Sequence, residues 1–415
     1  MNILSRPTRV IGLTLATAVL SAVATYASGQ QPAVDPRIGM GGFKPERMES
    51  KDLAPHAPKM TVTPPSEIPF SNLKVPPGFK VELWASGMPG GRMMARGDRG
   101  TIFMGTRIIG RVYAVIDQDG KREPKIIAEK LVQPNGVVFH GGSLYVAAID
   151  KVYRYDGIER VLDKVPEPTD MSKAFGLPPE VHHNWKFLAV GPDNKLYVPV
   201  GSPCNVCEIN TGVHGQIRRY NLDGSGMEIV ARGVRNSVGF DFHPKTGELW
   251  FTDNGRDWAG EVGFEEELNR VPANQIGAHY GFPFCHANGI PDPDIKKPNA
   301  CAGVNLPVTT LGAHSAALGM RFYTGSMFPA DYKDSILIAR RGSWNKTVKS
   351  GYDVVMVKAS PDGKNVVVKP FLTGFLDPKT NQFWGRPVDV LQMPDGSVLV
   401  ADEQNGAIFR VSYGK

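Results

Sequence analysis

The chain has 415 residues and a formal net charge of +6, with 47 Lys and Arg against 41 Asp and Glu. No run of Lys or Arg accompanies this mild excess, which argues against nucleic acid as a partner and slightly favours anionic ligands. The 46 Gly and 34 Pro suit many tight turns, and 41% hydrophobic residues allow a substantial core. A protein built of long helices is therefore not expected.

The N-terminus has the order of a secretory signal peptide. Arg6 and Arg9 precede an apolar run over residues 10–24, and small residues follow up to Ala27. We predict a signal peptide over residues 1–27, which makes the mature protein periplasmic or secreted and without a membrane span. The alternative is that the apolar run remains as an uncleaved membrane anchor.

Two further regions follow. Residues 28–74 are rich in Pro, Gly and charge without periodicity, so we predict an extended N-terminal arm. Over residues 75–415 a turn followed by a short apolar strand recurs six times, and further short strands flank most copies. The six turns begin at Gly100, Gly142, Asn194, Gly247, Asp334 and Gly396. This repeat predicts an all-β fold, a six-bladed β-propeller of four-stranded blades.

Four cysteines fit an exported chain. Cys204 and Cys207 form a C-x-x-C, whereas Cys285 and Cys301 lie in the segment 272–313, which interrupts the repeat as an inserted loop. An even count favours disulfides, and local pairing (204 with 207, 285 with 301) is the simplest arrangement. A zinc site built from all four cysteines is the alternative. The inserted loop either covers one face and grips a substrate or is only a surface decoration.

Five short stretches carry more specific information than the repeat. They are 182–186 (HHNWK), 233–236 (GVRN), 252–258 (TDNGRDW), 342–345 (GSWN) and 384–389 (WGRPVD). In this order they resemble the L-sorbosone dehydrogenase family, whose members depend on pyrroloquinoline quinone (PQQ). More distantly they are similar to the soluble quinoprotein glucose, aldose and pyranose dehydrogenases. The resemblance runs from about residue 75 to the C-terminus.

The resemblance implies oxidation of a sugar, or of a sugar-derived aldehyde or alcohol, by hydride transfer to the quinone. PQQ and Ca²⁺ are the implied cofactors. The implied partners are a small sugar or aldehyde substrate and a soluble electron acceptor such as a cytochrome c.

The implied general base is His183. Histidine suits this role because its reference pKa, about 6.5, lies near working pH. His182 is the rival, since neighbouring residues of an extended segment point to opposite sides and only one should reach the site. Two histidines with structural roles are the plainer alternative.

The resemblance also implies ligands for the cofactors. Arg235 and Asn236 would reach the quinone oxygens, where hydride transfer builds negative charge. Gly255 and Arg256 would bind calcium through main-chain carbonyls, although relatives closer to glucose dehydrogenase carry Pro at position 256. Asp253 and Asp257 could add carboxylates, or this stretch is only a turn.

Cations are expected around the carboxylates of PQQ. The resemblance places Arg386 as one clamp, while Val388 stands where the family has a second arginine. Arg341 is the other cation expected to bind the cofactor, with Arg340 and Lys346 as alternatives. Ordinary solvated cations are the plainer reading. The tryptophans of the same stretches could wall the site or belong to the core: Trp185, Trp258, Trp344 and Trp384.

Two other functions compete with the quinoprotein reading. A calcium-dependent, lactonase-like propeller hydrolase would hold its metal with several side-chain carboxylates and amides, and it has no need for the arginines. A non-catalytic binding propeller would not need His183. The ordered set of His, Arg-Asn, Asp-Asn-Gly and Arg-Pro-Val-Asp therefore favours the dehydrogenase.

Overall fold

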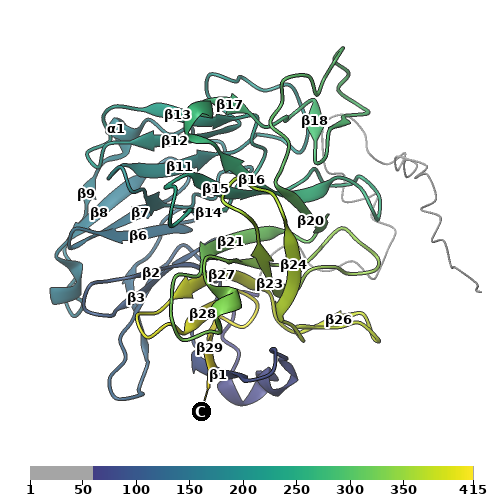
Figure 1. Cartoon of the computed structure of the whole chain (residues 1–415). Coiled ribbons are helices and arrows are strands. Elements are labelled where there is room, and N and C mark those ends of the chain that lie inside the picture. The colour runs from purple at the N-terminus through teal and green to yellow at the C-terminus, as the bar shows by residue number, and fades with distance from the viewer. Residues whose placement is uncertain (1–58, 415) are drawn as a thin grey trace, which may run out of the picture. The chain divides into compact units, whose positions relative to one another are not determined.

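The computed structural model of the chain describes residues 59–414, which form a six-bladed β-propeller (Figure 1). Each blade has four antiparallel strands, to which the third blade adds a fifth, and the first strands of neighbouring blades contact each other, as β2 contacts both β6 and β27. The predicted fold is confirmed. The signal peptide and most of the predicted arm lie outside the described residues, so those predictions stand as made.

The first three blades follow the chain in order. The first blade contains β2 (Gly91–Arg96), β3 (Ile102–Thr106), β4 (Val112–Val115) and β5 (Pro124–Ala128). The second contains β6 (Gly136–His140), β7 (Ser143–Ala147), β8 (Val152–Asp156) and β9 (Thr169–Asp170). The third contains β10 (Ala189–Val190), β11 (Leu196–Val200), β12 (Gln216–Tyr220) and β13 (Glu228–Arg232). A one-turn helix, α1 (Ser172–Phe175), follows the second blade.

Of the other three blades, the fourth is interrupted by a long excursion between its third and fourth strands. The fourth blade contains β14 (Gly239–Phe242), β15 (Leu249–Asp253), β16 (Glu265–Val271) and β20 (Thr309–Ala313). The fifth contains β21 (Ala317–Phe322), β22 (Ile336–Arg340), β23 (Asp353–Lys358) and β24 (Val367–Leu372). The sixth contains β27 (Pro387–Gln392), β28 (Val398–Asp402) and β29 (Ala407–Tyr413), together with β1 (Phe79–Ala85). A small hairpin of β25 (Leu376–Asp377) and β26 (Gln382–Phe383) precedes the last blade.

The sixth blade is completed by the N-terminal side of the domain. Strand β1 (Phe79–Ala85) pairs antiparallel with β29, so Phe79 lies opposite Tyr413. The described end of the arm continues this attachment, because Ile68 and Leu73 are buried in one cluster with Phe371. Two 3-10 turns, Pro65–Glu67 and Phe70–Asn72, shape that segment.

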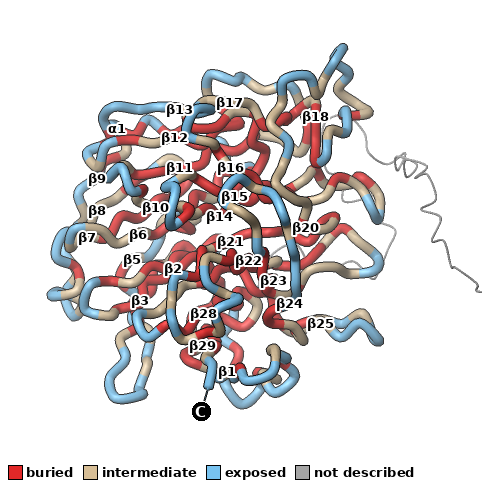
Figure 2. Tube along the Cα trace, viewed as in Figure 1, coloured by how far each residue is buried: buried red, intermediate tan, exposed pale blue. Residues whose placement is uncertain are grey.

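The six predicted turn-plus-strand units are the second strands of the six blades. Strands β3, β11, β15 and β28 are buried along their whole length, whereas β5 and β24 are largely exposed (Figure 2). A strand covered on both faces reads as a continuous apolar run, which is why these units stand out in the sequence.

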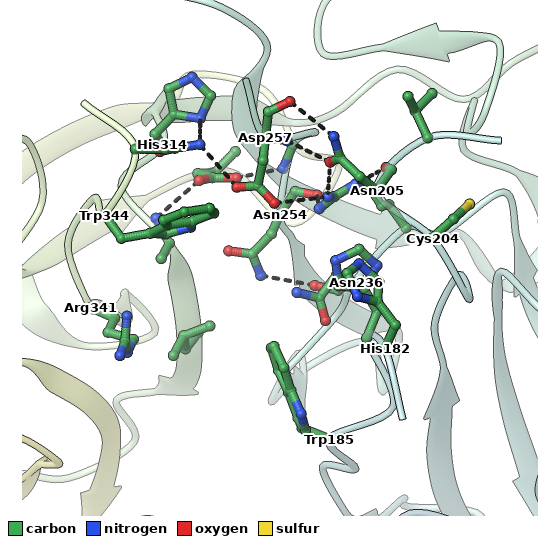
Figure 3. A pocket seen from close by; sticks show the side chains of 18 of the residues that line it. His182, Trp185, Cys204, Asn205, Asn236, Asn254, Asp257, His314, Arg341 and Trp344 are labelled. Atoms are coloured by element: carbon green, nitrogen blue, oxygen red, sulfur yellow. Dashed lines mark hydrogen bonds and ion pairs between the residues drawn. The ribbon is translucent and has the colours of Figure 1, made fainter. Parts of the chain in front are cut away.

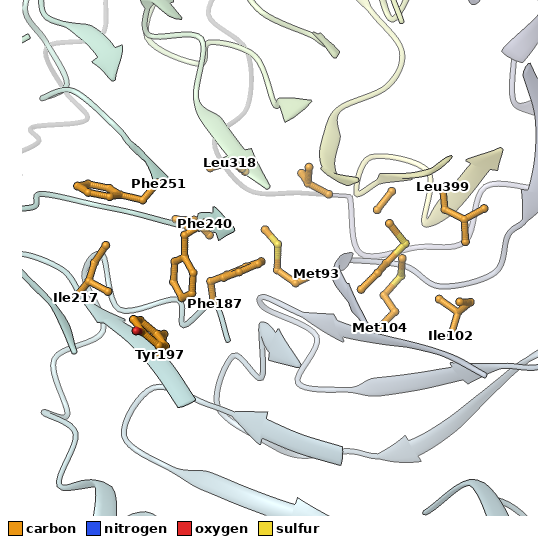
Figure 4. Close-up of a cluster of buried hydrophobic side chains, with 14 of the residues drawn as sticks. Met93, Ile102, Met104, Phe187, Tyr197, Ile217, Phe240, Phe251, Leu318 and Leu399 are labelled. Atoms are coloured by element: carbon orange, nitrogen blue, oxygen red, sulfur yellow. The ribbon is translucent and has the colours of Figure 1, made fainter. Parts of the chain in front are cut away.

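The core lies between the blades. Phe187 and Phe240, which come from the third and fourth blades, meet edge to face with ring centroids 4.7 Å apart. Met93 and Met104 of the first blade belong to the same buried cluster (Figure 4). Methionine fills irregular gaps of this kind because its side chain is unbranched and adaptable.

The segment 272–313 leaves the fourth blade after β16 and returns to it as β20. On the way, β17 (Ala278–His279) adds a parallel fifth strand to the third blade. A short hairpin of β18 (Cys285–His286) and β19 (Ile290–Pro291) follows. Both predicted disulfides, Cys204–Cys207 and Cys285–Cys301, are present. In the part of the chain that the structure describes, no helix is long and apolar enough to cross a membrane.

Candidate functional site

A cavity of about 680 Å³ opens at one end of the blades (Figure 3). The first and second strands of a blade are antiparallel, so residues that precede the first strand and residues that follow the second lie at the same end of the sheet. Five predicted site residues reach the cavity wall in this way: His183, Arg235, Asn236, Gly255 and Arg341. Arg256 and Arg386 do not line it.

His183 lies on the loop before β10 and is buried, whereas the neighbouring His182 is exposed at the cavity. The backbone of His183 is left-handed, with φ of 51°, which is uncommon for a residue other than glycine. Gly201 permits the close approach of this loop, since a Cβ on Gly201 would lie 2.2 Å from the carbonyl oxygen of His183. Burial, and next the charge of Arg235, hold the pKa of His183 well below its ordinary value. The imidazole is therefore neutral at neutral pH.

The hydrogen bonds around His183 determine its tautomer. Its Nδ1 lies 3.1 Å from Oγ of Ser202, and that hydroxyl donates its own hydrogen to the carbonyl of Cys204. A hydroxyl has one hydrogen, so Ser202 accepts from His183 and Nδ1 carries the ring proton. The lone pair therefore resides on Nε2, which makes this atom the proton acceptor.

Arg235 is buried in the wall and held by carbonyl and carboxylate oxygens. Its Nε donates to the carbonyl of Asn205 at 2.9 Å, and Nη2 donates to Oδ1 of Asn205 at 2.7 Å. Nη1 donates to the carbonyl of Asn254 at 3.1 Å, and Asp257 pairs with Nη2 at 3.3 Å. The guanidinium is thus fixed in place beside the cavity.

The loop after β15 gives the cavity an oxygen-rich side. The carboxylate of Asp253 accepts the main-chain N–H groups of Arg235 and Asn236, which joins this loop to the loop before β14. Gly255 lines the cavity, and a Cβ on it would lie 2.5 Å from the carbonyl oxygen of Phe264. Only glycine permits this approach of the two loops.

Glu266 also lines this side of the cavity, although it lies in none of the resembling stretches and was not predicted. Its carboxylate accepts the main-chain N–H groups of Gly255 and Ala316. Burial raises the pKa of Glu266 to about 8, although these hydrogen bonds lower it. Within residues 59–414, no group of three or more His, Cys, Asp or Glu side chains is placed to hold a metal ion.

The side chain of Arg256 points into the inserted segment. It is fully buried, with Nη1 2.7 Å from Asp292 and Nη2 2.7 Å from Asp294. Nε2 of His286 binds the same Asp292 at 2.8 Å. Arg256 therefore ties the loop that carries Gly255 to the excursion stapled by Cys285–Cys301, and its main-chain carbonyl is the part of the residue left for a ligand.

The opposite side of the cavity is strongly cationic. Arg92, Arg107 and Arg341 line it, all buried, and one buried carboxylate, Glu403, pairs with Arg92 at 2.6 Å and with Arg341. Burial alone raises the pKa of Glu403, but the surrounding arginines hold it well below its ordinary value. Three guanidinium groups facing one carboxylate leave a net positive wall.

Arg107 is the most exceptional of these cations. Its guanidinium lies 3.5 Å from the centroid of the Trp185 ring, and among the described residues no carboxylate is within ion-pair distance of it. Burial, and next the charges of Arg92 and Arg341, lower the pKa of Arg107 well below its ordinary value. A buried charge of this kind is costly unless an anion compensates it.

Arg386 lies behind this wall. It is fully buried, with its guanidinium 4.6 Å from the Phe383 ring centroid and 5.3 Å from that of Tyr352. Burial and the charge of Arg341 lower the pKa of Arg386 to about 9. Arg340 pairs with Asp353 at the outer side of its strand. The arginines on the cationic side of the cavity are thus Arg341 and the two of the first blade, Arg92 and Arg107, whereas Arg235 lies in another part of the wall.

Sequence reasoning missed Arg92 and Arg107 because neither lies in a resembling stretch. A signal was nevertheless present. Arg107 directly follows the second strand of the first blade, as Arg341 directly follows the second strand of the fifth. Comparison of equivalent positions across the six repeats would have placed Arg107 and Arg341 at the same end of the propeller. Trp258 and Trp344, left without a role, meet edge to face at the cavity with ring centroids 5.1 Å apart.

The fold and the site together define a six-bladed propeller with an arginine-lined cavity that suits a polyanionic ligand. The chain belongs to the TrAA12-like family, which matches residues 73–413. It is 33% identical over 366 residues to an uncharacterized protein of Borreliella burgdorferi, a match that covers 86% of this chain and 94% of that protein. It is 27% identical over 232 residues to the pyrroloquinoline quinone-dependent sugar dehydrogenase of Hypocrea jecorina, covering 44% and 53% of the two chains.

Solved structures agree with the architecture. An iodide structure of the Trichoderma reesei family AA12 enzyme matches with a TM-score of 0.70 and 19% identity, over 82% of this chain and 98% of that one. The holo pyranose dehydrogenase PQQ domain of Coprinopsis cinerea matches with a TM-score of 0.67 and 19% identity, over 82% and 97%. Soluble aldose sugar dehydrogenase of Escherichia coli gives 0.61 and 19%, over 81% and 99%. At these identities the likeness shows the fold.

Proposed function

We propose that this protein is a PQQ-dependent dehydrogenase that oxidises a sugar, or a sugar-derived aldehyde or alcohol. The observation that carries the proposal is a cavity lined both by a neutral histidine, whose Nδ1 is bound to Ser202, and by buried arginines. A related chain is described as a sugar dehydrogenase that depends on this quinone, which supports the same reading.

The cationic wall fits the quinone. PQQ carries three carboxylates, and arginine recognises carboxylates by paired, charge-assisted hydrogen bonds. Nε of Arg107 is a buried donor without a partner in the described part of the chain, so a carboxylate of the ligand would satisfy it. Asn236 would donate to the quinone oxygens through its amide nitrogen. We assign Arg92, Arg107 and Arg341 to the carboxylates, and Arg235 and Asn236 to the quinone oxygens. Arg386, which is close enough to Arg341 for the two charges to repel, would add to the positive potential of this side.

The oxygen-rich side fits calcium. Ca²⁺ takes six to eight oxygen ligands and accepts main-chain carbonyls. We propose the carbonyls of Gly255 and Arg256 as its ligands; within residues 59–414 neither of them accepts a hydrogen bond from the protein. The Glu266 carboxyl, which binds the N–H of Gly255, stabilises the loop that presents them. Calcium, when bound, supplies a Lewis acid and a counter-charge for the quinone.

Different residues of the chain would perform different parts of the reaction. PQQ, when bound, would supply the two-electron oxidant for the carbon that carries the substrate hydroxyl. Nε2 of His183 takes the hydroxyl proton, and the low pKa of this histidine keeps it in the neutral, accepting form. The guanidinium of Arg235 remains fixed by Asn205 and Asn254, so it stabilises negative charge without rearranging. Trp258 and Trp344 provide apolar faces for the sugar ring.

The proposal also covers the substrate, the electron acceptor and the location of the protein. Sorbosone and aldoses are the substrates to be tested first, and a soluble acceptor such as a cytochrome c would remove the electrons. Export through the predicted signal peptide would bring the protein to the periplasm or outside the cell.

Reconstitution tests the proposal. The chain lacking residues 1–27 is titrated with PQQ and calcium by absorbance and thermal shift, and dye reduction is then measured with a panel of sugars. We expect saturable, calcium-dependent binding and dye reduction. No PQQ binding would overturn the proposal and leave the lactonase-like hydrolase or the binding propeller.

Two histidine variants identify the base. We expect His183→Ala to bind PQQ and to lose dye reduction by about 10²- to 10⁴-fold, the usual contribution of a general base. His140→Ala, outside the cavity, controls for removal of a histidine. Loss of turnover in His182→Ala, with turnover retained in His183→Ala, would move the role to His182.

A further inference from the structure

The loop closed by the Cys204–Cys207 disulfide, here called the disulfide loop (residues 204–207), forms one wall of the cavity. It belongs to the third blade, between β11 and β12. Neither the resemblance nor the proposed mechanism gives it a task. Its contacts nevertheless reach His183, which the mechanism places at the substrate hydroxyl, and Arg235, which it places at the quinone oxygens.

The first contact leads to His183. The carbonyl of Cys204 accepts the hydroxyl hydrogen of Ser202, and this bond leaves the hydroxyl oxygen able to accept from Nδ1 of His183. Without the carbonyl of Cys204, Ser202 could instead donate to Nδ1, and Nε2 would then carry the ring proton. The position of one carbonyl in the loop therefore selects the tautomer.

The second contact leads to Arg235, which comes from the next blade. Asn205 accepts from this guanidinium twice, through its carbonyl at 2.9 Å and its Oδ1 at 2.7 Å. The same Oδ1 accepts the main-chain N–H of Asp257 at 2.8 Å, and the amide of Asn205 donates to the carbonyl of Asp257 at 3.1 Å (Figure 3). Asn205 thus bridges Arg235 and the loop that carries Gly255.

We propose that the disulfide loop is the positioning element that fixes the tautomer of His183 and the orientation of Arg235 relative to each other. The inference rests on the proposed function. His183 and Arg235 approach from loops of two different blades, and hydride transfer tolerates misplacement of only a fraction of an ångström. A four-residue covalent ring holds the Cys204 carbonyl and Asn205 together. Ser202, Cys204 and Asn205 are therefore positioning residues.

Asn205→Ala tests the arm that leads to Arg235. It removes the 2.7 Å acceptor of a charged hydrogen bond, which corresponds to about a ten- to hundred-fold effect. We expect kcat to fall by that factor while the KM for the sugar changes little. Asn210→Ala is the matched control, because Asn210 lies on the same connection but is exposed and outside the cavity wall.

Two variants test the arm that leads to His183. Ser202→Ala removes the acceptor of Nδ1, so the protonated imidazole is less stabilised, and the acid limb of the pH–rate profile should move to lower pH. Cys204→Ser/Cys207→Ser opens the loop and should reproduce both the loss of kcat and the shift. A merely structural loop would alter thermal stability without moving the pH profile.

Nitrogen-15 NMR of labelled histidine provides a readout that does not need turnover. We expect wild-type His183 to be protonated at Nδ1 and the opened-loop variant to show a mixture of tautomers. If wild type does not bind PQQ, the proposed function fails, and the NMR result still decides the inference. If wild type is active and the loop variants keep its kcat, pH profile and tautomer, the inference is wrong.

Discussion

Replacement of Arg256 by Met should destabilise the fold strongly. The side chain is fully buried and makes paired contacts to Asp292 at 2.9 and 2.7 Å, with a third contact to Asp294 at 2.7 Å. The Asp292 side chain is itself fully buried. Removing one partner of a buried pair leaves the other charge uncompensated, which costs about 3–5 kcal/mol. At about 2 °C per kcal/mol for a domain of this size, the Tm should fall by about 6–10 °C.

The same pair gives a pH dependence with a definite sign. Burial raises the pKa of Asp292, but the hydrogen bond from His286 and the charge of Arg256 hold it well below its ordinary value of 3.8. A carboxyl with a depressed folded-state pKa contributes stability above its ordinary pKa and loses it as the pH falls further. The difference between wild type and Arg256→Met should therefore shrink below about pH 4.

Thermal and urea denaturation would compare the stability of wild type, Arg256→Met, Arg256→Met combined with Asp292→Asn, and Arg154→Met. Asp292→Asn combined with Arg256→Met should recover part of the loss, because the fully buried charge of Asp292 is then removed as well and only the partly exposed Asp294 loses its partner. Arg154→Met removes a partly exposed pair with Asp156 and should cost less than about 1 kcal/mol. An Arg256→Met protein as stable as Arg154→Met would refute the assignment of this cluster as the anchor of the inserted segment.

Two further predictions concern the two sides of the cavity. Because burial raises the pKa of Glu266 to about 8, its contribution to stability is full below pH 4.5 and is lost as the pH rises through 8. Without calcium, Glu266→Gln should flatten the decline in unfolding free energy between pH 5 and 9; an unchanged slope would count against the shift. On the other side, Arg107→Met should weaken PQQ binding about ten- to hundred-fold and reduce its salt dependence, measured by absorbance titration. Arg122→Met, which breaks an ion pair with Asp117 outside the cavity wall, is the control, and equal affinities would remove Arg107 from the clamp.

Much of the fold could be predicted because short local sequence patterns determine where its turns and strands lie. Each second strand is a short apolar run after a turn, so the six repeats could be counted without any long-range information. The two disulfides followed from short separations of 3 and 16 residues. His183, Arg235 and Arg341 could be selected because they match the resembling stretches, and all three lie next to strand ends, which every blade places at one face of the propeller.

Only the tertiary structure decided what depends on ring closure and side-chain direction. Arg107 of the first blade and Arg341 of the fifth line the same cavity because the blades close into a ring, although the two residues are more than 200 positions apart. The side chain of Arg256 turns away to Asp292, and Arg386 lies behind the wall, although both belong to resembling stretches. A sequence pattern determines which residues stand at a strand end, but neighbouring blades determine which way each side chain can point, because close packing leaves each one few directions.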